Sequence, residues 1–160
     1  MPGVIGGRKP GSYEWYEIQD NIAYWQEFEQ PKVITGRFMD IPTFAYDGDK
    51  YYNNNANSFI AGANPMLAGV LNSNVSWYIL RNTCTDLQNG YLQAYNDNIA
   101  AITIPTAAPT QQTELETFVR QIVKARGEGA DVAALEAEVN ARVYRLFGLT
   151  AEEIAMVEEA

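Results

Sequence analysis

The sequence predicts an α+β fold: a small, mainly antiparallel sheet with packed helices, followed by an all-helical C-terminal hairpin and tail. Short apolar and aromatic runs separated by turn signals favour strands in the first two thirds of the chain. Composition changes near residue 105, since nine of the ten tyrosines and twelve of the thirteen asparagines lie before residue 100. Beyond that point apolar residues recur at helical spacing. We therefore divide the chain into a flexible lead-in (1–12), an α+β domain (13–105), a Pro/Ala/Thr joint (106–113) and a helical tail (114–160).

The α+β domain is expected to begin with a short helix and a strand. Apolar residues spaced three apart predict a helix over Asn21–Glu29. The run "PKVITGRF" is expected to be a strand, with Pro31 at its start, where a missing N–H does least harm. A β-hairpin is then predicted over "TFAYDGDKYYN", because Asp47-Gly48 tolerates the left-handed backbone of a tight turn. "NSFIAG" predicts a further short strand.

The remaining elements of this domain follow from turn and cap signals. Asn64-Pro65 predicts the start of a helix that ends around "NSN", because proline is favoured at the first helical position. "VSWYILRN" fits either a second helix or a buried strand, since periodicity alone does not decide. Asn89-Gly90 indicates another turn, and "IAAITIP" is expected to be a last apolar strand.

The tail is predicted to be a helical hairpin plus one more helix. Apolar residues repeat at helical spacing over 115–123, and "GEG" breaks that helix. Asp131 is expected to cap the next helix, whose apolar stripe consists of Val132, Leu135, Val139, Val143 and Leu146. Gly148 fits a helix C-terminus, and Thr150 with Glu153 forms a capping box for the last helix. The stripes are expected to pack on a neighbouring domain or on one another, with a coiled-coil dimer as the alternative.

Composition excludes several kinds of chemistry. The chain has no histidine, so Ser-His-Asp, Cys-His and His-metal sites cannot form within it. Cys84 is the only cysteine, which rules out an internal disulfide and fits a reducing cytoplasm. No apolar run approaches the roughly 20 residues of a membrane span, and no secretory signal is apparent. The net charge is −9, and neither part of the chain has the basic excess typical of a freestanding nucleic-acid binder.

The order of several motifs resembles a known family. "EFEQPKVITG", "PTFAYDGDKYYNNN", "LAGVLNSNVSWYIL", "NGYLQAYNDNIAAITIP" and "VNARVYRLFGLTAEEIAMVE" occur in that order between Trp15 and Glu158. Each is weak alone, but together they resemble the TaqI-like C-terminal specificity domain of type IIG restriction–modification enzymes. That domain is the target-recognition part of adenine-specific DNA methyltransferases, so the resemblance implies that residues 13–105 form a DNA target-recognition domain.

The sequence departs from the full enzymes of that family. Their catalytic part binds S-adenosylmethionine with a glycine-rich loop and orients adenine with Asn-Pro-Pro-Tyr/Phe, and neither motif is present. "ANPML" lacks the second proline and the aromatic residue, and no nuclease signature stands out. The resemblance therefore implies a specificity region with no catalytic residues, metal site or cofactor of its own. Its expected partners are double-stranded DNA and an upstream methyltransferase domain, which would use S-adenosylmethionine to methylate adenine N6.

The resemblance suggests which residues contact DNA. Asparagine and glutamine donate and accept hydrogen bonds at once, so they can pair with adenine in the major groove, and tyrosine can stack on bases or contact phosphate. The base-reading candidates are Tyr52, Asn53, Asn54, Asn55, Asn89, Tyr91 and Gln93. The phosphate-binding candidates, which position a protein without reading sequence, are Lys32, Arg37, Lys50 and Arg81.

Structural roles remain open for the same residues. The asparagines from Asn53 to Asn57 are also typical of turns in which side chains bond their own backbone. One of Tyr51 and Tyr52 is expected to face the core, as are Trp15, Trp25 and Trp77. Two other functions are compatible with the sequence. One is a protein-interaction module that docks through the helical tail, and the other is a carbohydrate-binding module suggested by the aromatic and amide content.

Overall fold

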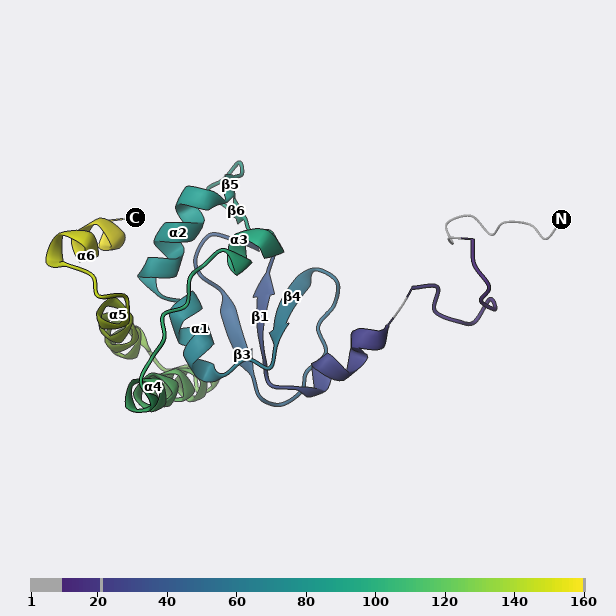
Figure 1. Ribbon diagram of the computed structural model, residues 1–160, viewed down its shortest axis with the longest axis horizontal. Helices are drawn as coiled ribbons and strands as arrows, with labels where there is room; N and C mark the ends of the chain where they lie inside the picture. Colours follow the sequence, from purple (N-terminus) through teal and green to yellow (C-terminus); the bar gives the residue numbers. More distant parts are fainter. Residues whose placement is uncertain (1–9, 21, 160) are drawn as a thin grey trace.

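The protein has an α+β fold with two small antiparallel sheets of three strands each (Figure 1). The computed structural model describes residues 10–20 and 22–159. Most of the predicted lead-in, and Asn21 at the start of the first predicted helix, lie outside the described residues. The elements are the 3-10 helix η1 (Ala23–Glu29), strands β1 (Lys32–Gly36), β2 (Phe38–Met39), β3 (Phe44–Asp47), β4 (Asn57–Ala61), β5 (Thr85–Asp86) and β6 (Leu92–Gln93), and helices α1 (Pro65–Leu71), α2 (Asn74–Thr83), α3 (Asn96–Ala100), α4 (Pro109–Gly127), α5 (Ala133–Phe147) and α6 (Ala151–Glu158).

Strand β1 is the centre of the first sheet, whose order is β3-β1-β4. Val33 of β1 lies opposite Tyr46 on one side and Ile60 on the other, and these three side chains belong to or pack against the buried core. The neighbouring residues point to the opposite face because side chains alternate along a strand. On that face Phe59 contacts the ring of Phe28 from η1, with ring centroids 4.5 Å apart.

The predicted hairpin at Asp47-Gly48 is wrong. Strand β3 pairs with β1, and the residues after it, Lys50 to Asn53, form no strand. The Asp47 carboxylate accepts hydrogen bonds from the backbone N–H groups of Asp49, at 2.7 Å, and Tyr51, at 2.8 Å. Because these bonds turn the chain locally, they compete with the strand pairing that a hairpin needs.

The second sheet has the order β2-β6-β5 and contains the turn that the sequence predicted. Asn89 and Gly90 both have positive φ, at 78° and 79°, as a tight hairpin turn between β5 and β6 requires. The strand predicted over "IAAITIP" is wrong: Asn96–Ala100 is helix α3, and no strand follows it among the described residues. Ile99 and Ile102 are both buried at a spacing of three, which is a helical rather than an alternating pattern.

Helices α1 and α2 follow their cap signals. Asn64 accepts a hydrogen bond from the backbone N–H of Leu67, with Pro65 at the first helical position, as predicted. The ambiguous segment "VSWYILRN" is part of α2, whose buried residues include Val75 and Leu80.

The helical tail packs on the first part of the chain. Helix α4 begins at Pro109, inside the predicted joint, and lies against α1. A Cβ atom placed on Gly69 would be 2.8 Å from Cγ2 of Val119, so the two helices approach closely where Gly69 has no side chain. Buried side chains from β1, α1, α4, α5 and α6 belong to one hydrophobic cluster. The stripe over α5, the left-handed Gly148 and the Thr150–Glu153 capping box are confirmed.

Two of the three tryptophans are not in the core. Trp15 is 78% exposed and Trp25 is 49% exposed, whereas Trp77 is half-buried against the core. Residues 10–20 run away from the body of the protein, and η1 contributes no buried residue (Figure 1). An aromatic residue is expected inside only where another element covers it, so the prediction for Trp15 and Trp25 is wrong.

Candidate nucleic-acid interface

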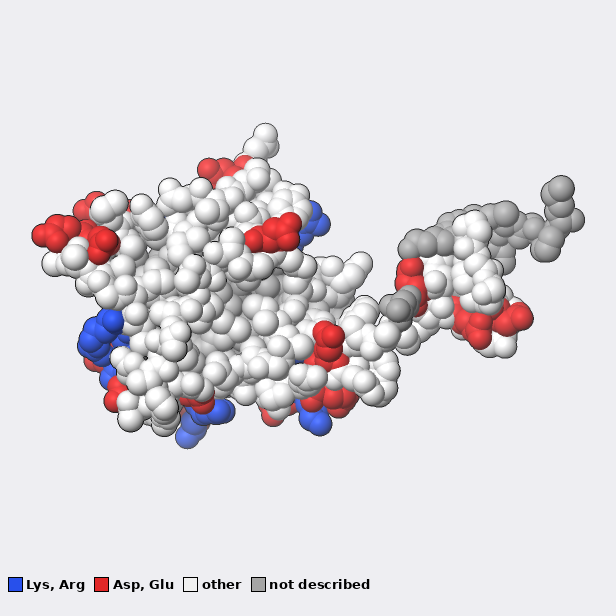
Figure 2. All heavy atoms as spheres, viewed as in Figure 1, with Lys and Arg blue, Asp and Glu red and all other residues white. Residues whose placement is uncertain are grey.

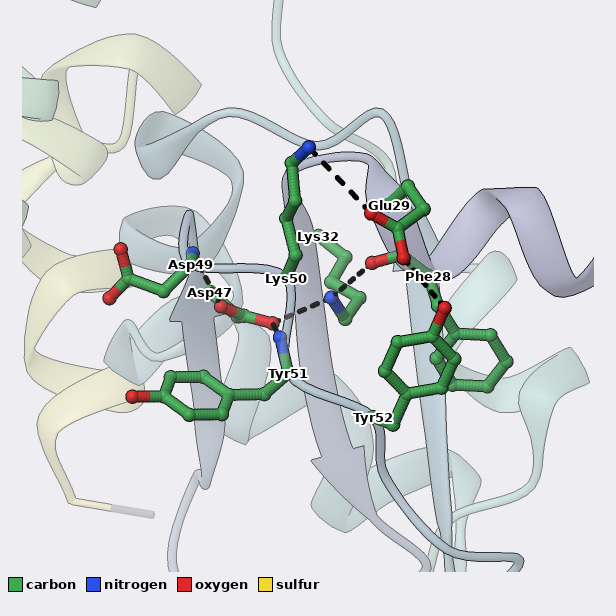
Figure 3. Close-up of polar contacts among 8 residues, drawn as sticks. All are labelled: Phe28, Glu29, Lys32, Asp47, Asp49, Lys50, Tyr51 and Tyr52. Atoms are coloured by element: carbon green, nitrogen blue, oxygen red, sulfur yellow. Dashed lines mark hydrogen bonds and ion pairs between the residues drawn. The ribbon is translucent and has the colours of Figure 1, made fainter.

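Polar residues at the start of β1, at the end of β3 and in the adjoining loops form a network of ion pairs and hydrogen bonds, which we call the Lys32 network (Glu29, Lys32, Asp47, Lys50 and Tyr52). The side chain of Lys32 is fully buried, and its ammonium lies 2.6 Å from Asp47 Oδ2 and donates to the Phe28 carbonyl at 2.9 Å (Figure 3). A buried ammonium that faces a carboxylate cannot reach a phosphate. The prediction that Lys32 binds phosphate therefore does not fit the structure.

The protonation of Asp47 follows from this pairing. Burial alone would raise the pKa of its carboxyl group. The hydrogen bonds from Lys32 and from the backbone N–H groups of Asp49 and Tyr51, with the positive charge of Lys32, outweigh burial and hold the pKa of Asp47 below its ordinary value. Asp47 is therefore a buried carboxylate that neutralises Lys32.

Tyr52 and Lys50 are held by the same network. The Tyr52 ring stacks on Phe28 with centroids 4.7 Å apart, and its hydroxyl donates to Glu29 Oε1 at 2.6 Å (Figure 3). This bond lowers the pKa of Glu29 and raises the pKa of Tyr52. Lys50 lies 3.7 Å from the other Glu29 oxygen. Tyr51 and Tyr52 are both exposed, so the prediction that one of them faces the core is wrong.

The asparagines after Tyr52 mainly stabilise their own loop. Asn53 Nδ2 donates to the carbonyl oxygens of Asn54, at 3.1 Å, and Asn57, at 3.0 Å. Asn54 Oδ1 accepts from the backbone N–H of Ala56 at 3.0 Å. The expectation that these side chains bond their own backbone is thus confirmed for Asn53 and Asn54. Asn55 and Asn57 are exposed and their side chains make no hydrogen bond with the described residues, so these two amides of the group are open to a ligand.

A different arrangement lies just beyond the other end of β1, and we call it the Arg37 cluster (Arg37, Phe38, Tyr91, Gln93 and Tyr95). The hydrogen-bond network orients the Gln93 amide with its oxygen toward Arg37. That oxygen accepts from Arg37 Nε at 3.1 Å, from Arg37 Nη2 at 3.0 Å and from the Tyr95 hydroxyl at 3.0 Å. The Arg37 guanidinium also lies 4.5 Å from the centroid of the Tyr95 ring and 5.9 Å from that of Phe38.

The second sheet positions these side chains. Phe38 pairs with Gln93, and the backbone N–H of Ala94 donates to the Arg37 carbonyl at 2.9 Å. Leu92 is buried, and Tyr91 beside it is exposed. The sheet thus holds its apolar side in the core and presents a strip of aromatic, amide and guanidinium groups to solvent.

Two contacts connect the region of the Arg37 cluster with the loop from Asn53 to Asn57, which we call the asparagine loop. Asn57 lies opposite Gly36, the residue before Arg37, and the Ser58 hydroxyl donates to Asn96 Oδ1 at 2.9 Å.

Asn89 occupies the tip of the β5–β6 hairpin. Arg81 stands apart on α2, with its guanidinium 5.9 Å from the Trp77 ring centroid. The candidates therefore divide into the Arg37 cluster with the hairpin tip, the Lys32 network, the loop of Asn53, Asn54 and Asn55, and Arg81 on α2.

Sequence reasoning did not identify Phe38 and Tyr95 as site residues. The signal for Tyr95 was its position two residues after Gln93, which places both on the same side of an extended segment. Phe38 follows Arg37 directly and is 55% exposed, although an isolated phenylalanine in a strand is normally taken for core.

Charges of both signs are scattered over the surface. Figure 2 shows acidic and basic groups interspersed in this view, without an extended basic face. Most cations among the described residues are paired with carboxylates, including Lys50, Arg120, Lys124, Arg126 and Arg142. None of the ion pairs formed among the described residues involves Arg37 or Arg81. Arg37 and Arg81 are therefore the phosphate candidates whose charge is not offset by an adjacent carboxylate.

Two features of residues 10–20 and 22–159 bear on catalysis, namely their metal-ligating side chains and the thiol of Cys84. No group of three or more Cys, Asp or Glu residues in these ranges could hold a metal ion. Burial raises the pKa of the Cys84 thiol, although a hydrogen bond with Thr83 opposes this, and a neutral thiol is a poor nucleophile. None of the helices in the described part of the chain has the length and apolar character needed to cross a membrane.

Comparisons with protein-family models and with curated proteins found no match to this chain.

Proposed function

We propose that the chain is a DNA target-recognition domain whose reading surface is the Arg37 cluster together with the Asn89-Gly90 hairpin tip. It would select the DNA sequence on which a separate, cytoplasmic adenine-N6 methyltransferase domain acts with S-adenosylmethionine. The order of motifs that resembles the TaqI-like specificity domains supports the proposal. The observation that carries it is an exposed guanidinium with no carboxylate partner among the described residues, held between amide and aromatic side chains, in a protein of net charge −9.

The shape of this surface is compatible with duplex DNA. The major groove of B-DNA admits a two-stranded β-ribbon, and β5 and β6 form such a ribbon with Asn89 at its tip. Affinity for DNA responds to the local field more than to the net charge of the protein. The net charge of −9 therefore does not exclude binding at the Arg37 cluster.

The electrostatic contribution is expected to be modest. Because Lys32 is buried, only Arg37, Lys50 and Arg81 remain of the four phosphate candidates, and Lys50 must leave Glu29 to take part. With at most three phosphate contacts, the slope of log affinity against log salt is expected to be no steeper than about −3. A separate catalytic domain would supply the remaining affinity.

A titration monitored by NMR tests the proposal even when binding is weak. Duplex DNA of mixed sequence added at low salt is expected to shift the Arg37 Nε–H and Gln93 amide signals, and these shifts should diminish as salt is raised. Signals of α5 serve as the internal control, since this helix lies away from the proposed surface. Unchanged spectra at low salt, or shifts confined to the helical tail, would contradict the proposal.

Protein docking is a second candidate function, and the structure favours a different segment for it from the tail. The apolar stripes of α4 and α5 are largely covered, with Leu115 and Val143 fully buried. By contrast, the large side chains of Tyr16, Ile18, Ile22, Tyr24 and Trp25 are exposed. Several large apolar side chains exposed within one short stretch of chain are typical of a protein contact. We expect it to meet the separate catalytic domain.

Co-sedimentation with an adenine methyltransferase catalytic domain tests this second candidate. The variant Ile18→Ser is expected to weaken the association, and Val123→Ser on α4 is the matched control because Val123 is also exposed. Loss of association with the α4 variant alone would instead indicate docking through the helical tail.

A further inference from the structure

We infer that Arg37 reads a base rather than a phosphate, and that the DNA sequence recognised contains a guanine facing strand β2. This inference rests on the proposed function and names the chemical group that the Arg37 cluster recognises. It also changes the role that the sequence suggested for Arg37.

The orientation of the guanidinium is the first argument. A guanidinium has five N–H donors in a planar fork. The Gln93 oxygen accepts from Nε and from Nη2, on the same edge of the fork. The remaining edge therefore presents one Nη1–H and one Nη2–H, side by side, to solvent. Two adjacent donors match the O6 and N7 acceptors of guanine in the major groove, which is the commonest specific contact between arginine and a base.

The charge of the supporting group is the second argument. Gln93 orients Arg37 without neutralising it, because an amide carries no charge. In the Lys32 network the cations Lys32 and Lys50 face Asp47 and Glu29, which offset their charge. The Arg37 guanidinium thus keeps its full attraction for the electronegative edge of guanine while its direction is restricted.

Preorganisation is the third argument. A phosphate can be approached from many directions, so a phosphate contact does not need an oriented side chain. Here the Tyr95 ring lies 4.5 Å from the guanidinium, and the Tyr95 hydroxyl donates to the same Gln93 oxygen at 3.0 Å. An arginine that is already ordered loses less side-chain entropy when it binds. Such ordering favours selective recognition of one base.

Arg81 provides a matched comparison within the chain. Its guanidinium also lies near an aromatic ring, 5.9 Å from the centroid of Trp77, and it too forms no ion pair with the described residues. No amide among the described residues orients the Arg81 fork. Arg81 is therefore expected to behave as a general cation, and a substitution there should not alter base preference.

Selection of duplexes from a random-sequence library by the 160-residue chain is the first step of the test. One position of the selected sequence is expected to be guanine. The variants Arg37→Ala and Arg37→Lys should both lose the preference at that position, by about 5- to 150-fold against other bases, and keep it elsewhere. Arg37→Lys retains the positive charge but lacks the planar pair of N–H donors, so it separates the effect of donor geometry from the effect of charge. Arg81→Ala should leave every preference unchanged.

Base analogues then test the contact atoms. Replacing the selected guanine by 7-deazaguanine removes the N7 acceptor and should weaken binding of the wild-type protein but not of Arg37→Ala. Replacing it by hypoxanthine keeps O6 and N7, removes only a minor-groove amino group, and should leave binding nearly unchanged.

Three outcomes would overturn the inference. If Arg37→Ala weakens all duplexes equally and reduces the salt slope by about 1, Arg37 contacts phosphate, and the proposed function still stands. If the chain binds duplexes with no base preference, Arg37 does not read a base. Only the DNA-binding part of the proposed function would then stand. If no salt-dependent binding to DNA occurs, both the inference and the proposed function are wrong.

Discussion

The two ends of strand β1 contain similar polar side chains but hold them in different ways. At the N-terminal end of β1, Lys32 and Lys50 face carboxylates and the Tyr52 hydroxyl is bonded to Glu29. Beyond the C-terminal end, Arg37 faces an amide and two aromatic rings. A cation paired with a carboxylate stabilises the fold, whereas one oriented by a neutral group remains available to a ligand. The partner of a basic residue therefore indicates its role better than its residue type does.

The largest effect should come from breaking the buried ion pair. Asp47→Asn leaves the Lys32 ammonium buried without a counter-charge and is expected to lower the free energy of unfolding by about 3–5 kcal/mol. Urea denaturation measures this change. Asp49→Asn is the control, because its side chain is exposed, and it should change stability by less than about 0.5 kcal/mol. Equal effects of the two substitutions would mean that the pair does not stabilise this end of β1.

The same pair predicts how stability depends on pH. The pKa of Asp47 is lower in the folded than in the unfolded protein, where it is about 3.9. A group with a lowered folded pKa contributes its full stabilisation above the unfolded value and loses it as the pH falls through the folded value. The difference in stability between wild type and Asp47→Asn should thus be constant above about pH 5 and shrink below about pH 4. A difference that grows on acidification would contradict this account.

Adding a charge to the Arg37 cluster should make it resemble the Lys32 network. Gln93→Glu places a carboxylate beside Arg37 and is expected to weaken DNA binding by about tenfold at low salt, because it offsets the cation and repels phosphate. Stability should change by less than about 1 kcal/mol, since an exposed ion pair contributes little. Fluorescence anisotropy with a labelled duplex measures the binding, and Gln88→Glu on the same hairpin is the control for added negative charge. Equal weakening by both variants would indicate a general charge effect and not a specific role of Gln93.

The smallest effects are expected in the asparagine loop. Asn54→Ala removes the hydrogen bond to the Ala56 backbone and should lower the free energy of unfolding by about 0.5–1.5 kcal/mol. Asn55→Ala should leave stability unchanged, because its side chain makes no hydrogen bond with the described residues. Thermal unfolding of the two variants compares them directly. If Asn55→Ala is the more destabilising, the assignment of the loop bonds is wrong.

Local signals predicted the parts of the fold that depend on neighbouring residues. The caps at Asn64, Gly148 and Thr150 and the turn at Asn89-Gly90 each involve residues that are close in sequence, and all are confirmed. The hairpin at Asp47-Gly48 could not be judged from the dipeptide alone, because the Asp47 carboxylate bonds the backbone after it and also pairs with Lys32 on another strand.

The candidate site depends even more than the fold on contacts between residues that are distant in sequence. Sequence identified Gln93 and Arg37 as members of a reading surface but did not show that they are in contact, because they belong to elements far apart in the chain. The asparagines were identified by their residue type. The hydrogen bonds of Asn53 and Asn54 within their own loop depend on the backbone conformation of that loop, which residue type does not define. Phe38 and Tyr95 were missed because their exposure is a property of the folded sheet.

The close approach of Val119 to Gly69 has a consequence for limited proteolysis. A protease that cut the irregular segment between α3 and α4 would produce two fragments whose apolar surfaces still interlock across α1 and α4. We expect such fragments to co-elute in size-exclusion chromatography under native conditions and to separate only in denaturant. The helical tail is in this sense an integral part of the molecule, and removing it would expose the buried side chains of α1 that α4 covers.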